Sequence, residues 1–117
     1  MSFVQYVILR KDLQTTLGWP LGALIAQACH AATAVLHIYQ EDENTRAYLA
    51  KLDSMHKVVL QIPDAESLNE LASTLTTNNI DFKLWIEQPE NIPTCIAIKP
   101  YPRDVVKPLV KQFKLYS

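Results

Sequence analysis

The chain has 117 residues but only two glycines and two cysteines. Cys29 and Cys95 lie far apart in the sequence, with neither the paired spacing of a zinc site nor the density of a disulfide scaffold, so we expect two reduced thiols. Seven prolines against two glycines indicate stiff connections between elements. The net charge of −1 argues against a protein whose whole surface coats nucleic acid.

Long apolar runs are also lacking. The longest uncharged stretch, residues 13–40, is interrupted by polar side chains that include Gln27, His30 and His37, so a membrane span is a poor interpretation. The first residues lack the basic and then apolar order of a secretory signal. We therefore expect a soluble, cytoplasmic protein with no membrane partner.

Apolar residues make up 49% of the chain and charged residues 20%, a balance typical of a compact globular protein. A chain of this length forms one domain, which we expect to span residues 1–117. Charge is unevenly spread, because residues 99–117 carry +4 and the rest of the chain −5. The basic end is therefore the part to examine for contact with a polyanion.

Hydrophobic periodicity predicts four strands and four helices. The strands are expected at 3–9, 57–62, 82–87 and 94–99, and the helices at about 20–39, 43–52, 65–78 and 103–113. Residues 13–19 and 88–93 are expected to be loops, and Pro108 is expected to kink the last helix or divide it in two. This order predicts the α/β class: one three-layer domain with a four-stranded mixed sheet and helices on both faces.

The helix predicted from about Pro20 to Tyr39 organises the chain. Six alanines give it little side-chain bulk, so it can lie unusually close to a neighbouring sheet or helix. Gln27 and His30 are three residues apart and therefore project from the same side of this helix. The sequence thus predicts a polar pair on a smooth helical surface.

That pair has an ordinary explanation as well. Most helical Gln and His side chains in folded proteins pack or meet solvent with their hydrogen bonds satisfied. Cys29 and His30 cannot form a nucleophile and base pair, because successive helical residues point about 100° apart. Residue type alone therefore favours a packing or surface role for Gln27 and His30.

Two sequence segments change that balance. Arg10-Lys11-Asp12-Leu13, followed by the run from Gly22 to Ala31 with its Ala-Gln-x-x-His-Ala pattern, resembles the signature of the type II peptidyl-tRNA hydrolases of archaea and eukaryotes. The resemblance continues through Lys-Val-Val-Leu at residues 57–60 and Ile-Ala-Ile-x-Pro at residues 96–100. Residues 87–92 and 94–97 are similar to the eukaryotic branch called peptidyl-tRNA hydrolase domain-containing protein.

This resemblance implies a single α/β domain that releases peptide from peptidyl-tRNA without a metal or an organic cofactor. Ester hydrolysis needs a positioned water, a group that accepts its proton and hydrogen-bond donors for the developing oxyanion. If the loops after the first and third strands meet the long helix, residues of these types converge. The candidate catalytic residues are Lys11, Asp12, Gln27, His30 and Glu87, and the candidate substrate-binding residues beside them are Asn91 and Thr94.

We expect these residues to act in catalysis or binding, but each also has a more ordinary structural explanation. We expect His30 to act as base or to orient the water, Glu87 to hold its ring, and Gln27, Asn91 or Thr94 to supply donors. A Glu at a strand end is otherwise a solvated charge, and Asn and Thr near a turn otherwise shape that turn. The two interpretations differ in geometry, because the first requires convergence of these side chains.

The chain departs from the family in two places. The family's helix usually starts with Gly-Lys, and that lysine is considered essential, whereas Gly22 is followed here by Ala23. The second family signature usually begins with Asp and has Ala-Gly and Thr-Gln before a longer loop, whereas this chain has Glu87 and a shorter connection. The sequence therefore leaves open a hydrolase of reduced activity, a hydrolase of another ester or amide, and a non-catalytic RNA- or protein-binding module with the same fold.

The basic end of the chain gives a separate expectation. Arg103, Lys107 and Lys111 recur every four residues and therefore fall along one helical face. A solvated face is the commonest use of this spacing. As substrate-binding residues they would contact tRNA phosphates, which predicts salt-sensitive binding of peptidyl-tRNA, the expected partner. The sequence is compatible with a homodimer.

Overall fold

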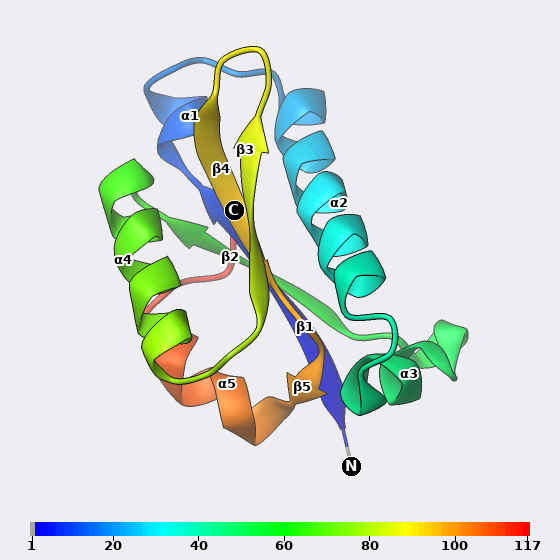
Figure 1. Ribbon diagram of the computed structural model, residues 1–117. Coiled ribbons are helices and arrows are strands. Elements are labelled where there is room, and N and C mark those ends of the chain that lie inside the picture. The colour runs from blue at the N-terminus through cyan, green and yellow to red at the C-terminus, as the bar shows by residue number, and fades with distance from the viewer. Residues whose placement is uncertain (1) are drawn as a thin grey trace.

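The structure is a computed structural model that describes residues 2–117 (Figure 1). Its strands are β1 (Phe3–Arg10), β2 (Lys57–Ile62), β3 (Phe82–Glu87), β4 (Ile92–Ile98) and the short β5 (Tyr101–Pro102). Its helices are α1 (Asp12–Thr15), α2 (Leu21–Ile38), α3 (Glu43–Leu49), α4 (Ala65–Thr77) and α5 (Arg103–Val110), with a 3-10 turn at Leu52–Ser54.

The strands form a mixed sheet in the order β2-β1-β4-β3. β1 is parallel to β2 and antiparallel to β4, and β4 is antiparallel to β3. β1 and β3 therefore point the same way, and their carboxyl ends lie at the same end of the sheet. β5 pairs with the opposite end of β1, where Phe3 faces Pro102.

Side chains of β1 alternate between two apolar layers, because successive strand residues point to opposite faces. Val4, Tyr6 and Ile8 belong to the layer covered by α4 and α5, whereas Val7 and Leu9 belong to the layer under α2. Figure 1 shows α2 on one side of the strands and α4 on the other. The predicted α/β arrangement, with helices on both faces of a four-stranded mixed sheet, is confirmed.

α2 lies close to the sheet, as its alanines predict. Ala31 is fully buried, and the Cys95 thiol of β4 donates to the backbone carbonyl of Gln27 with an S···O distance of 3.2 Å. The helix is long and apolar enough to cross a membrane by length and composition, with a mean hydropathy of 1.5. In this structure it instead forms one of the three layers of the domain.

Several predicted boundaries are wrong at the ends of elements. The expected loop 13–19 contains the end of α1, and the positive φ of 69° at Gly18 then turns the chain toward α2. β4 begins at Ile92, inside the expected loop 88–93, because Ile92 pairs with Glu87 of β3. α5 ends at Val110, two residues after Pro108, rather than near residue 113.

The C-terminal residues 114–117 line the outer edge of β2, a pairing that the sequence did not predict. The amide of Gln61 donates to the carbonyl of Lys114 at 2.9 Å, and the amide of Tyr116 donates to the carbonyl of Val59 at 2.9 Å. Leu60 and Leu115 form an isolated antiparallel bridge. This C-terminal segment therefore occupies backbone groups that an edge strand otherwise leaves open.

Candidate active site

Gln27 is the centre of a hydrogen-bonded group that joins α2, β3 and β4. Its side-chain nitrogen donates to Glu87 Oε2 and to the carbonyl of Ala23, each at 3.2 Å. Its side-chain oxygen accepts from the Thr94 hydroxyl at 2.9 Å. Gln27 is 1% exposed and Thr94 fully buried, so the group is fixed inside the layer between α2 and the sheet.

This geometry changes the roles expected for Gln27 and Thr94. An amide nitrogen has two hydrogens, and both are engaged, one by Ala23 and one by Glu87. The single hydroxyl hydrogen of Thr94 is engaged by Gln27. Neither side chain has a donor left for an oxyanion. Thr94 orients Gln27, and Gln27 in turn holds the Glu87 carboxylate in place.

Glu87 sits at the carboxyl end of β3, where alternation places it on the same face as Trp85. The Trp85 indole donates to Glu87 Oε1 at 3.0 Å, while Gln27 donates to Oε2. These hydrogen bonds, that of Trp85 first, lower the pKa of Glu87, because they favour the charged carboxylate. Glu87 is therefore an ionised, oriented acceptor at neutral pH.

His30 lies one turn after Gln27 on α2 and is exposed. Its ring stacks on Trp85, with ring centroids 4.7 Å apart and an interplanar angle of 18°. Within residues 2–117 no hydrogen bond joins His30 to Glu87, so the expected ring-holding contact differs from the one observed. Trp85 contacts both side chains: its ring stacks on the His30 imidazole, and its indole N–H donates to the Glu87 carboxylate. Trp85 therefore brings His30 and Glu87 near each other.

Asp12 reaches this group through a second set of contacts. Its two carboxylate oxygens accept from the Arg10 guanidinium, each at 2.9 Å, in a bidentate pair. Arg10 also donates to the carbonyl of Pro93 at 2.8 Å, immediately before Thr94. Arg10 is 7% exposed. The carboxyl end of β1 is thus tied to the start of β4, and Asp12 serves as the partner of a nearly buried cation.

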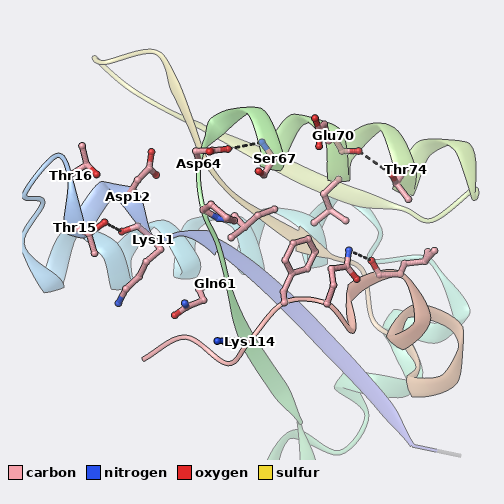
Figure 2. A pocket seen from close by; sticks show the side chains of 16 residues that line it. Lys11, Asp12, Thr15, Thr16, Gln61, Asp64, Ser67, Glu70, Thr74 and Lys114 are labelled. Atoms are coloured by element: carbon pink, nitrogen blue, oxygen red, sulfur yellow. Dashed lines mark hydrogen bonds between the residues drawn. The ribbon is translucent and has the colours of Figure 1, made fainter.

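Lys11, expected beside His30, contacts the C-terminal segment instead. Its ammonium donates to Gln14 at 3.0 Å and to the backbone oxygen of Ser117, and it lies 4.5 Å from the centroid of the Tyr116 ring. Lys11 and Asp12 line a cavity of about 990 Å³ between α1, the end of β2 and α4 (Figure 2). Gln27, His30 and Glu87 do not line this cavity, so convergence holds for only part of the expected set.

Four further residues lie outside the Gln27 group. Asn91 occupies the β3–β4 turn with a φ of 58°, and its side chain accepts from Gln88 at 3.3 Å, as expected of a residue that shapes a turn. Arg103, Lys107 and Lys111 belong to α5 and its end. The amide of Arg103 donates to the carbonyl of Ser2, so α5 begins at the end of the sheet opposite the carboxyl ends of β1 and β3 (Figure 1). The residues that follow α5 return toward the carboxyl end of β2, where Gln112 and Lys114 line the cavity together with Lys11.

Sequence reasoning missed Trp85 and Arg10. The signal for Trp85 was its position two residues before Glu87 in a strand, since residues i and i+2 share a face. For Arg10, the signal was Asp12, an acidic residue two positions later at the end of the strand, with which the guanidinium could pair. Among the described residues, no three His, Cys, Asp or Glu side chains are grouped closely enough to hold a metal ion.

Comparison with known proteins identifies the family. The family model described as peptidyl-tRNA hydrolase PTH2 matches residues 3–116. The chain belongs to the PTH2 family. Two PTH2-like relatives, each named "Putative peptidyl-tRNA hydrolase PTRHD1", are 57% identical in Homo sapiens and 56% identical in Mus musculus over 115 residues. Each alignment covers 97% of this chain and 82% of the relative.

The PTH2 fold also occurs in a distant solved structure. A protein of unknown function, Atu0240, from Agrobacterium tumefaciens strain C58 superposes with a TM-score of 0.60 at 15% identity. The alignment covers 100% of this chain and 99% of that one. At this identity the similarity establishes the common α/β fold and carries no information about chemistry.

Position 23 relates the PTH2 signature to the observed geometry. The carbonyl of Ala23 accepts from the Gln27 side chain, four residues later on α2. A lysine at this position would project from the same side of the helix as Gln27, since residues i and i+4 are neighbours. Ala23 places no cation on this side of α2, where the sequence resemblance leads us to expect the family lysine.

Proposed function

We propose that this PTH2 domain hydrolyses the ester bond of peptidyl-tRNA and releases peptide and tRNA, at a rate reduced by the alanine at position 23. One observation carries the proposal: Gln27 and Trp85 hold the Glu87 carboxylate from two sides, and Trp85 stacks against the exposed His30. An oriented anion and an imidazole thus lie side by side at the sheet end where the family motif occurs.

The reaction needs few steps from these groups. Within residues 2–117 no hydrogen bond engages the ring nitrogens of His30, so they are available to a water molecule. In our proposal His30 accepts a proton from this water as its oxygen attacks the ester carbonyl, and Glu87 stabilises the imidazolium that forms. The bond from the carbonyl carbon to the ribose oxygen then breaks, and His30 returns the proton to that oxygen.

Substrate binding is the second part of the proposal. Arg103 lies at the other end of β1, whose eight residues span roughly 26 Å. Lys107 and Lys111 follow along α5 toward Lys114, whose carbonyl accepts from the amide of Gln61 near the carboxyl end of β2. Contact of all three with tRNA phosphates therefore requires an RNA that extends along the molecule away from the ester. Neutralising all three should reduce the slope of log K against log salt by between about 2 and 3, since each phosphate contact contributes roughly 0.7–0.9.

A non-catalytic RNA- or protein-binding module is the second candidate function. The observation that favours it is Ala23, because a family cation next to Glu87 is missing while the fold and the Gln27 group persist. Under this alternative the unmodified chain binds tRNA without cleaving its ester.

The deciding experiment measures cleavage of purified peptidyl-tRNA by the wild-type chain and by His30→Ala. We expect measurable cleavage by the wild type and a loss of about 10²–10⁴-fold in His30→Ala, the usual contribution of a general base. His37→Ala is the matched control, because His37 is an exposed histidine in the last turn of α2, away from Glu87.

Ala23→Lys separates the two candidate functions. If the wild type is a hydrolase of reduced activity, the added cation raises an existing rate that His30→Ala abolishes. Cleavage that appears only in Ala23→Lys supports the binding module for the natural sequence. Equal cleavage by wild type and a folded His30→Ala contradicts the proposed role of the imidazole.

A further inference from the structure

A second feature of the molecule lies on the other side of α2 from His30. A groove of about 630 Å³ runs between α2 and the β2 edge of the sheet, a volume within the range of small-molecule sites. Its walls are mainly aliphatic and include Leu21, Ile25 and Leu52, which are 61%, 55% and 63% exposed. Soluble proteins rarely leave apolar side chains grouped in this way without a use for them.

The groove is long and has distinct ends. α2 runs antiparallel to β1, because the Gln5 side chain near the start of β1 donates to the carbonyl of Ala32 late in α2. The groove is lined by α2 residues from Leu21 to Leu36, fifteen residues apart, which corresponds to roughly 22 Å of helix. Leu21 therefore marks one end, and Lys57, which pairs with Gln5 at the start of β2, marks the other.

Lys57 is the charged residue of the lining. Its ammonium donates to Gln5 Oε1 and to the Tyr48 hydroxyl at 3.3 Å, and it lies 5.2 Å from the centroid of the Tyr48 ring. These partners are neutral, and the ion pairs between side chains of residues 2–117 involve other residues. Lys57 is exposed as a residue, but desolvation of its ammonium by the surrounding side chains lowers its pKa.

We propose that this groove binds a single-chain amphiphile with an anionic headgroup, such as a fatty acid, with the carboxylate at Lys57 and the tail along α2 toward Leu21. An aliphatic groove with a cation at its end, bonded only to neutral partners, complements such a molecule in both shape and charge. An extended peptide fits less well, because its backbone amides and carbonyls would lose water without gaining partners from the aliphatic walls. The site is separate from the proposed hydrolase site.

Cys29 provides the readout. It lines the groove and is exposed, whereas Cys95 is fully buried, so a thiol reagent on the native protein reports on the groove alone. Dodecanoate, added below its micelle concentration, should slow modification of Cys29 with a saturable dependence. From decanoate to dodecanoate the affinity should rise roughly fourfold per methylene, the increment expected for burial of each CH₂. Dodecyltrimethylammonium should bind at least tenfold more weakly.

Three variants test the placement of head and tail. Lys57→Met should weaken dodecanoate binding by about 10- to 100-fold, whereas Lys51→Met, at an exposed lysine outside the lining, should leave it unchanged. Thr33→Trp places a large ring in the groove from an exposed position and should abolish binding. Circular dichroism establishes that each variant is folded.

Several results would overturn the proposal. These are equal affinity for the anionic and cationic amphiphiles, unchanged binding in folded Lys57→Met, or no protection of Cys29 by any chain length. Protection of Cys29 that depends on protein concentration, with a dimer in sedimentation, would assign the groove to a second copy. Binding to phosphatidylcholine vesicles without binding of monomeric dodecanoate would assign it to a membrane surface.

Discussion

The hydrogen bond between Thr94 and Gln27 allows a quantitative test of the proposed positioning role. Thr94→Val removes the hydroxyl that donates to Gln27 Oε1 at 2.9 Å while keeping a β-branched side chain of similar shape. Both residues are buried, at 0% and 1% exposure, so water cannot replace the lost donor. Leaving a buried acceptor unpaired costs about 1–3 kcal/mol, and no cavity term adds to it.

This free energy corresponds to a measurable change in melting temperature. The unfolding entropy of about 2.1 cal/mol/K per residue gives roughly 0.25 kcal/mol/K for a chain of 117 residues. Each kcal/mol then lowers the midpoint by about 4 °C, so Thr94→Val should melt about 4–12 °C below the wild type. Urea denaturation at neutral pH, followed by circular dichroism, should give the same loss with an unchanged m value.

Thr45→Val is a matched control, because the same substitution there should not lower the stability of the protein. It is also fully buried, but within residues 2–117 its hydroxyl has no hydrogen-bond partner. Thr45→Val removes an unsatisfied polar group and should be neutral or stabilising by up to about 1 kcal/mol. If Thr94→Val and Thr45→Val change stability by the same amount, the Gln27 hydrogen bond does not carry the energy assigned to it.

A double-mutant cycle connects this bond to the site. Gln27→Leu combined with Thr94→Val removes both partners, so the pair should be less destabilising than the sum of the single changes, by about 0.5–3 kcal/mol. In the proposed hydrolase, both single variants should lower kcat more than they raise KM, because they misplace Glu87 without removing it. An additive cycle would show that Gln27 and Thr94 act independently.

Three further predictions concern titratable groups. The pKa of Glu87 is lower in the folded protein than in the unfolded chain, so the ionised carboxylate stabilises the fold above about pH 4.3. This stabilisation is lost as the pH falls through the pKa of Glu87 in the folded protein. In acid denaturation, Glu87→Gln should remove this part of the pH dependence of stability. Asp42 caps α3 by accepting from two backbone amides, and it also pairs with the buried Lys99 ammonium at 2.6 Å. Asp42→Asn keeps the cap but leaves Lys99 without an anion, and should cost about 3 kcal/mol in urea denaturation, more than Lys99→Met. Burial raises the pKa of Cys95 to about 12, so a thiol reagent should titrate only Cys29 until the protein unfolds.

The fold followed closely from the sequence because periodicity is a local signal. The uncharged, alanine-rich stretch of α2, the alternation in β3 and the Asp64 cap of α4 each depend on residues near one another, and these elements occur as predicted. The C-terminal segment and β5 form by pairing with distant strands, Leu115 with Leu60 and Tyr101 with Val4. No local pattern encodes such pairing, so the sequence did not predict it.

The candidate site was predictable in part for the same reason. Helical spacing placed Gln27 and His30 on one side of α2, and strand alternation placed Glu87 on a defined face. The direction of Lys11 depends on Tyr116 and Ser117, which lie about a hundred positions away in the sequence and contact its ammonium. Spacing gives the side of an element on which a residue lies, but not the group that its side chain meets.

The C-terminal segment also affects how copies of this molecule can associate. With Gln61 and Val59 of β2 already bonded to residues 114 and 116, another chain can extend the sheet at that margin only by displacing this segment. Among residues 2–117, no strand lies beyond β3 at the opposite edge of the sheet. Two molecules that paired through their β3 edges would satisfy each other's open backbone groups without displacing the C-terminal segment, and the assembly would end at a dimer.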